Sequence, residues 1–172
     1  IDASAPRTVI DLGCGPGNLT ALLADRWPSA AITGIDASAE MIESALAGPA
    51  GERMRFEQGD LREWVAQNHR GTADVIVSNA TLQWVPDHLD LLPELVAAVR
   101  PGGWLAFQVP HNDDQPSTTI RDELAAEPPY VMFTAGASRI AARDAGTYLQ
   151  ALQGLGCEVD AWETTYLRVL RG

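Results

Sequence analysis

The sequence lacks a long apolar run. No stretch reaches the roughly eighteen consecutive apolar residues that a membrane-spanning helix needs, and no basic segment followed by an apolar one opens the chain, as in a secretory signal. These absences argue against a membrane protein and against a secreted one. We therefore expect a soluble protein that does not act at a membrane.

Cysteine is also scarce, with two residues in a chain of 172. Cys14 and Cys157 form no metal-ligand spacing, and two distant cysteines do not make a disulfide framework. We therefore expect no bound metal. A reducing cytoplasm is the compartment that fits this cysteine content best.

Positive charge is the third shortage. The chain has 23 Asp and Glu residues against 12 Lys and Arg, so its net charge is −11, and no basic cluster interrupts the negative field. Such a field repels polyanions. We therefore predict a small-molecule ligand and no nucleic-acid partner, while no pattern predicts the oligomeric state.

What is present is a regular alternation of short β-branched runs with stretches of helical periodicity, which is typical of parallel βαβ units. At this length, with 46% hydrophobic residues, the chain is predicted to form one domain over 1–172. We predict an α/β, Rossmann-like fold, with a doubly wound, mostly parallel sheet and helices on both faces. The expected strands are 7–12, 31–35, 53–58, 73–78, 104–109 and 158–167. The expected helices are about 19–27, 39–45, 61–64, a long one from just beyond Pro86 to about 99, 117–126 and 148–155.

Several finer features of these helices follow from the same patterns. Ser38 and Asp60 are suited to N-cap the second and third helices, and Gly156 to cap the last. Apolar spacing predicts that the first helix buries Leu19, Leu22 and Leu23, and that the second presents Met41, Ile42 and Ala45 on one face. The turn at 101–103 (PGG) is expected to end the helix that carries Val99.

A glycine loop follows the first expected strand, in the segment VIDLGCGPG at 9–17. Glycines permit either a tight turn or the close approach of a ligand to the backbone. Asp36 ends the second expected strand, where a carboxylate can accept hydrogen bonds from both hydroxyls of a ribose. Asp11 stands before the first glycine, and no Lys or Arg occurs between Thr8 and Asp25. The loop therefore favours a cationic ligand, such as a sulfonium that also carries an ammonium group, over a pyrophosphate.

The segments VIDLGCGPGNLT, ITGIDAS, GDL and RPGGWLAF resemble the motifs of the class I S-adenosylmethionine-dependent methyltransferases. The resemblance implies that the glycine loop meets the methionine part of S-adenosylmethionine, that Asp36 holds the ribose, and that neighbouring segments flank the adenine. Asp60 is equally suited to cap a helix, and both roles can coexist. The implied cofactor-binding residues are Asp11, Gly13, Cys14, Gly15, Asp36, Ala37, Met41, Asp60, Leu61 and Asn79.

Three further segments, SNATLQWVPDH, QVPHND and GCEVDAWETTY, are similar to the trans-aconitate 2-methyltransferase family. That resemblance implies methyl transfer to a carboxylate of trans-aconitate, giving a monomethyl ester and S-adenosylhomocysteine. A carboxylate is already ionised at neutral pH, so we expect residues that orient it and no general base. The candidates for this orienting role in catalysis are Gln83, Trp84 and His88. The candidates for substrate binding are His111, Asn112, Arg121 and Tyr166.

The region 110–143 has the weakest periodicity, and we expect it to cover the substrate. It holds Arg121 and Arg139 and ends at Arg143, whose guanidinium groups could bind a tricarboxylate or simply be solvated. Members of the family usually have a helix before the first strand and a seventh strand. We recognise neither here, so the chain is expected to be incomplete at both ends.

Three alternatives remain open on the sequence. The chain could methylate another small carboxylic acid or another small molecule. It could be an NAD-dependent oxidoreductase in which Asp36 makes the same ribose contact. It could also be a non-catalytic domain that binds S-adenosylmethionine.

Overall fold

The computed structural model describes residues 1–48, 53–112, 115–136, 142–166 and 169. The chain divides into two compact units, residues 1–142 and 143–172. The prediction of one domain over the whole length stays a prediction. Among the described residues, no helix is long and apolar enough to cross a membrane.

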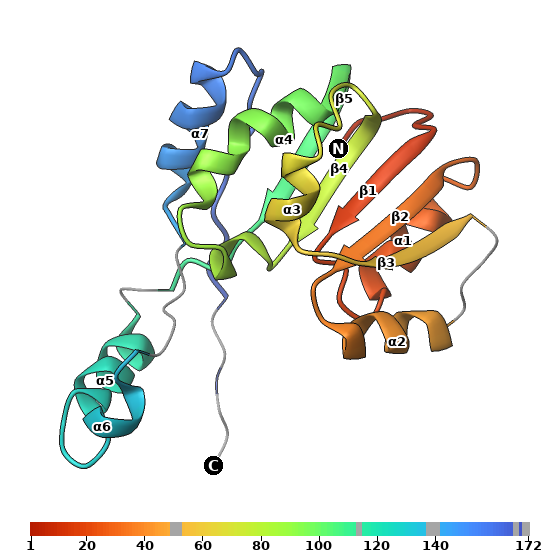
Figure 1. Cartoon of the computed structure of the whole chain (residues 1–172). Coiled ribbons are helices and arrows are strands. Elements are labelled where there is room, and N and C mark those ends of the chain that lie inside the picture. Colours follow the sequence, from red (N-terminus) through yellow and green to blue (C-terminus); the bar gives the residue numbers. More distant parts are fainter. Residues whose placement is uncertain (49–52, 113–114, 137–141, 167–168, 170–172) are drawn as a thin grey trace. The chain divides into compact units, whose positions relative to one another are not determined.

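The first unit is built on a five-stranded parallel sheet in the order β3-β2-β1-β4-β5, which confirms the predicted fold class (Figure 1). The carboxyl ends of these strands share one edge of the sheet, and the order reverses between β1 and β4. In such sheets, ligands bind at that reversal point. The strands are β1 (Thr8–Leu12), β2 (Ala31–Asp36), β3 (Met54–Gln58), β4 (Ala73–Asn79) and β5 (Val99–Gln108).

Helices connect these strands by the crossovers that parallel strands require. Figure 1 shows α3 and α4 together on one face of the sheet and α1 on the other. The helices of this part are α1 (Asn18–Arg26), α2 (Ala39–Ala47), α3 (Leu61–Ala66) and α4 (Leu92–Ala98), with two 3-10 helices, η1 (Leu82–Trp84) and η2 (His88–Leu91). The caps at Ser38 and Asp60 are confirmed, since each side chain accepts backbone N–H groups of the first turn.

The buried face of α1 is rotated from the predicted one. Thr20, Leu23 and Ala24 are buried, and Leu23 packs in a core cluster with Val9 of β1 and Ile32 of β2. Leu22 is 65% exposed, so its predicted burial is wrong. The helix instead buries a threonine, because a partner for its hydroxyl group lies inside, as described below.

Met41 also departs from its predicted face. Ile42 and Ala45 of α2 are buried, but Met41 is exposed at the carboxyl edge of the sheet. An i, i+1 pair cannot face one direction on a helix, so only one of Met41 and Ile42 can reach the core.

The helix before β5 is shorter than predicted, and the strand is longer. Val99 belongs to β5 and pairs with Ala73, so the prediction that it continues the helix is wrong. The 101–103 turn does not end a helix but lies inside the strand, where Gly102 adopts φ +77 and the register shifts before pairing resumes at Trp104. Apolar spacing alone cannot separate a last helical turn from the first residue of a strand.

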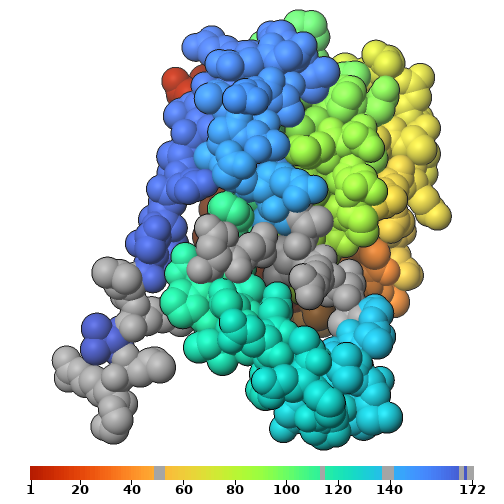
Figure 2. All heavy atoms as spheres, turned by 90° about the vertical axis from the view of Figure 1, so that its left-hand side faces the viewer, coloured from red at the N-terminus to blue at the C-terminus, as the bar shows by residue number. Residues whose placement is uncertain are grey.

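Two short helices occupy the region predicted to cover the substrate. α5 (Pro116–Ala125) confirms the predicted helix at 117–126, and α6 (Val131–Thr134) was not predicted. The hydroxyl of Thr134 donates to the carbonyl of Ala125 at 2.7 Å and joins the two. Figure 2 shows their side chains gathered in one teal-to-cyan cluster. Whether this region covers a substrate stays a prediction.

The second unit contains α7 (Ala145–Gly154), which confirms the last predicted helix with an earlier start. Asp144 caps its first turn, and its end carries the paired bonds of a Schellman motif, from Gly156 N–H to Gln153 and from Cys157 N–H to Leu152. The predicted strand at 158–167 is wrong for 158–166, which lie in no strand; residue 167 is outside the described residues. A segment of residues that favour β-structure forms a strand only where a neighbouring strand pairs with its backbone.

A buried carboxylate fastens the amino ends of the central strands. Asp74 of β4 accepts the backbone N–H groups of Arg7 and Thr8 at 2.8 Å each, and Arg100 of β5 pairs with it. We expect Asp74→Ala to lower the free energy of unfolding by about 2 kcal/mol, because two N–H groups and one guanidinium lose their acceptor. Urea unfolding measures this. Asp122→Ala, which removes the exposed pair with Arg121, is the matched control and should change stability by less than about 0.5 kcal/mol. Equal effects of the two substitutions would contradict the assignment.

Candidate functional site

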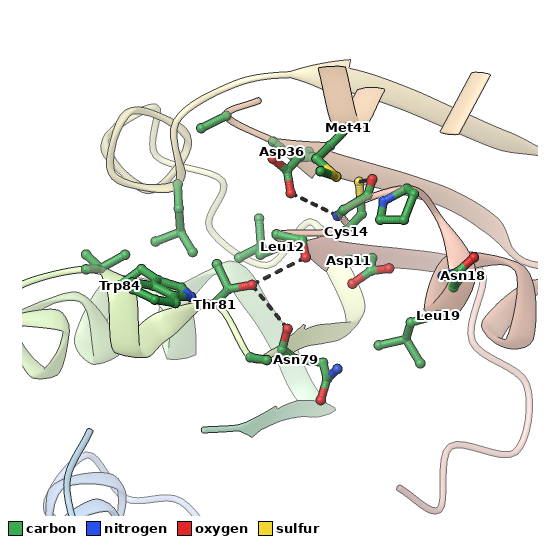
Figure 3. A pocket seen from close by; sticks show the side chains of 18 of the residues that line it. Asp11, Leu12, Cys14, Asn18, Leu19, Asp36, Met41, Asn79, Thr81 and Trp84 are labelled. Carbon is green, nitrogen blue, oxygen red and sulfur yellow. Dashed lines mark hydrogen bonds between the residues drawn. The ribbon is translucent and has the colours of Figure 1, made fainter. Parts of the chain in front are cut away.

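A cavity of about 800 Å³ lies at the carboxyl edge of the sheet, where the strand order reverses. Its walls come from the ends of β1, β2 and β4, the glycine loop, the first turns of α1, α2 and α3, and η1. Figure 3 shows the side chains of Asp11, Asp36, Met41 and Trp84 around it. All these elements belong to the first unit.

The glycines of the loop have different tasks. Gly13 has φ +76, and a Cβ there would lie 1.9 Å from the Thr81 hydroxyl oxygen, so this glycine permits close packing against the segment after β4. Gly15 has φ +54 with no atom within 4 Å of an added Cβ, and it lines the cavity. The sequence left open whether the loop is a tight turn or a ligand loop. The structure has the geometry of both, at different glycines.

Asp36 fixes the loop from the end of β2. One carboxylate oxygen accepts the Gly15 N–H and the other accepts the Ser38 N–H, both at 2.9 Å (Figure 3 draws the first). Each oxygen has a second lone pair for a ligand hydroxyl group. Asp36 can therefore hold the protein backbone and a diol at once.

Asp11 lies deeper in the same cavity and is only 1% exposed. One of its oxygens accepts the Thr20 hydroxyl at 2.6 Å, and the other, Oδ1, is buried without a hydrogen bond. The pKa of Asp11 is raised to about 6, chiefly by burial and in addition by the charge of Asp36, while the Thr20 hydrogen bond acts in the opposite direction.

Asp60, Leu61, Ala37 and Met41 also line the cavity. Asp60 caps α3 through Oδ1, which accepts the N–H groups of Arg62 and Glu63. Its second oxygen takes no part in the cap, so the two predicted roles of Asp60 are compatible. Met41 and Leu61 contribute apolar surface to the cavity, and such a surface suits an aromatic ring.

The structure thus brings all ten predicted cofactor-binding residues around one cavity. Of the three predicted orienting residues, only Trp84 reaches it, 59% exposed. Gln83 and His88 are buried and do not line it. The Gln83 amide donates to the Ala80 carbonyl at 2.6 Å, and His88 Nδ1 lies 3.1 Å from the Val85 carbonyl oxygen. These two side chains support the segment that carries Trp84.

Among the described residues, none of those predicted to bind a substrate is part of the cavity lining. His111 and Asn112 follow β5, exposed and outside the cavity lining, and Arg121 on α5 pairs with Asp122. Tyr166 and Arg143 belong to the second unit, and Arg139 lies outside the described residues. Their roles in binding a substrate stay predictions.

Three residues of the site were missed on the sequence. Thr20 carries a weak signal, a polar residue inside an apolar helix pattern. The hydroxyl group of Thr81 donates to the Gly13 carbonyl oxygen at 3.3 Å, and nothing in the sequence around Thr81 indicates this contact. Ala80 adopts φ +54 without being glycine, so no turn residue marks the sharp exit from β4.

Cys14 is a buried thiol in the cavity wall. Its pKa is raised to about 12, first by burial and then by the negative charges of Asp11 and Asp36. Because the thiolate is the reactive form, we expect iodoacetamide at pH 8 to alkylate Cys14 at least ~10-fold more slowly than the half-buried Cys157. Mass spectrometry of peptides over time measures both sites. Equal rates would contradict the placement of Cys14.

Comparison with known proteins gives concordant results. A family model described as a methyltransferase domain matches residues 2–161. A Streptomyces avermitilis protein named trans-aconitate 2-methyltransferase is 49% identical over 97% of this chain, and a Rhodococcus jostii protein of the same name is 44% identical over 100% of it. The chain spans 63% and 66% of the lengths of these two relatives. An S-adenosylmethionine-dependent methyltransferase from Mesorhizobium loti has the same fold, with a TM-score of 0.66, 22% identity, and coverage of 91% of this chain and 76% of that one.

Proposed function

This chain belongs to the family of methyltransferase domains, and on that premise we propose that it transfers a methyl group from S-adenosylmethionine to a carboxylate of trans-aconitate. The observation that carries the proposal is the charge of the cavity. Asp11, Asp36 and Asp60 line it, and no Arg does among the described residues. Such a wall suits a cationic sulfonium ligand and disfavours the pyrophosphate of a dinucleotide.

The described residues fit this ligand part by part. Asp36 has lone pairs for two ribose hydroxyl groups beside its backbone bonds. Met41 and Leu61 offer apolar surface to an adenine ring. Asp60, which precedes Leu61 in the chain, can accept a hydrogen bond from the amino group of that ring. When bound, S-adenosylmethionine supplies a methyl group on a positively charged sulfur.

The acceptor side supports a carboxylate as the nucleophile. An ionised carboxylate needs no general base, and the described cavity lining contains no His, Lys or Tyr to act as one; its carboxylates, Asp11, Asp36 and Asp60, are those assigned to the cofactor. Trp84 presents a large apolar surface at the cavity and can exclude water from the acceptor. The chain's contribution to catalysis is therefore alignment and desolvation, which can supply several kcal/mol.

The name and identity of the relatives supply the choice of trans-aconitate.

Both cysteines are free thiols, which supports our proposal of a reducing cytoplasmic location.

The test is methyl transfer from radiolabelled S-adenosylmethionine to a panel of small di- and tricarboxylic acids. We expect labelling of trans-aconitate and release of the label by mild base, because a methyl ester hydrolyses there whereas an ether or a methylamine does not. Labelling of another acid, with none of trans-aconitate, would overturn the choice of substrate. Calorimetric binding of NAD without binding of S-adenosylhomocysteine would overturn the whole proposal.

A further inference from the structure

The side chains of Thr20 and Asp11 form a hydrogen-bonded pair that is almost completely buried. Thr20 is fully buried on α1, and its hydroxyl group donates to Asp11 Oδ2 at 2.6 Å. Asp11 Oδ1 is buried in the cavity wall without a hydrogen bond. A buried carboxylate oxygen left in this state is costly unless something arrives to pair with it.

Within the described part of the chain, no positively charged group pairs with Asp11. Its neighbours in the sheet are Gly34 of β2 and Val77 of β4, which carry no charge. From α1 it meets the hydroxyl group of Thr20, and from the glycine loop the neutral thiol of Cys14. Among the described residues, the charged group that acts on Asp11 is Asp36 at the end of β2, whose charge has the same sign. A cationic group of the ligand can supply the compensating charge.

We propose that Thr20 is a positioning residue that holds Asp11 as an ionised, inward-facing carboxylate, so that the cavity binds ligands whose methionine end carries an ammonium group. This inference rests on the proposed function, since S-adenosylmethionine and S-adenosylhomocysteine both carry that group. 5′-Methylthioadenosine has the same nucleoside and sulfur but no ammonium, and its binding should not depend on the pair.

The pair makes binding depend on pH in a defined direction. Because the pKa of Asp11 is raised to about 6, the free cavity holds a neutral carboxyl group in an increasing fraction of molecules as pH falls below 7. A bound ammonium favours the ionised form and lowers that pKa again. Affinity for S-adenosylhomocysteine should therefore fall as pH decreases through 6. Binding at pH 6 should release about half a proton per ligand to the buffer.

The experiment is calorimetry on the full chain from pH 5 to 8, in buffers of different ionisation enthalpy. Thr20→Val removes the hydrogen bond at constant shape, and we expect the pH profile for S-adenosylhomocysteine to move up by roughly one unit, because a bond to a charged group is lost. At pH 6 the affinity should fall roughly fivefold, and at pH 8 it should be nearly unchanged. Thr20→Ser, which retains the hydroxyl group, should restore the wild-type profile.

Each outcome bears on one inference. If Thr20→Val weakens S-adenosylhomocysteine and 5′-methylthioadenosine equally at every pH, Thr20 has only a packing role and the proposal is overturned. An unchanged pH profile in Thr20→Val overturns it as well. If the wild-type chain binds neither ligand, the proposed function fails instead. Thermal unfolding of each variant confirms that the protein being measured is folded.

Discussion

Replacing Asp36 by alanine should weaken S-adenosylhomocysteine binding by about 100-fold or more. The substitution removes the carboxylate that we propose as the acceptor for two ribose hydroxyl groups and, at the same time, the bonds that hold the N–H groups of Gly15 and Ser38. Each hydrogen bond to a charged acceptor contributes about 1.5–3 kcal/mol, so the loss of the two ligand bonds alone accounts for this factor. Isothermal titration calorimetry at pH 8 measures it.

The matched control for Asp36→Ala is Asp25→Ala. Asp25 is an exposed carboxylate on α1 that does not line the cavity, so its removal changes the net charge of the chain by the same amount. We expect less than about a twofold change in affinity, because exposed charges are screened by salt. If the two variants lost affinity equally, the effect would come from net charge and not from a ribose contact.

Gly13→Ala should destabilise the fold by about 3–5 kcal/mol. The new Cβ would overlap the Thr81 side chain, with contacts of 1.9 to 2.5 Å, and alanine is strained at φ +76. Little net stability remains for a domain of this size after such a loss. Denaturant unfolding followed by circular dichroism measures it, and we expect a lower midpoint with an unchanged slope.

Gly15→Ala separates this steric effect from the effect of backbone strain. Its φ is also positive, at +54, but no atom lies within 4 Å of the added methyl group. We expect about 1–2 kcal/mol of destabilisation, together with a clear loss of ligand affinity, because the methyl group enters the cavity. If Gly13→Ala were no more destabilising than Gly15→Ala, the contact with Thr81 would not constrain the loop.

Much of the fold could be predicted because local and long-range signals agree in the first half of the chain. The runs that became β1, β2 and β4 are β-branched and bounded by glycine or polar residues, and Ser38 and Asp60 cap helices as their side chains require. The end of the chain was mispredicted for the opposite reason. The pattern of 158–167 is favourable for a strand, but strand formation depends on a partner that the sequence pattern does not reveal.

That the ten predicted cofactor-binding residues line one cavity could be predicted because backbone geometry dictates where they lie. Glycines, an acid at a strand end and a helix cap each occupy a position that few other residues can fill. The positions of the three predicted orienting residues could not be predicted in this way, since only Trp84 reaches the cavity. The 3-10 turn of η1 directs Trp84 outward and Gln83 inward, and such a short turn has no periodicity from which these directions could be inferred.

The close packing of Thr81 against Gly13 makes the residues that can occupy positions 13 and 81 depend on each other in evolution. A lineage that gained a side chain at position 13 would need glycine at position 81, because even the Cβ of Thr81 lies 2.5 Å from the added atom. Position 81, in the segment that carries Trp84, therefore cannot change independently of position 13. An engineer who redesigns this segment must keep glycine at position 13 or remove the side chain at position 81.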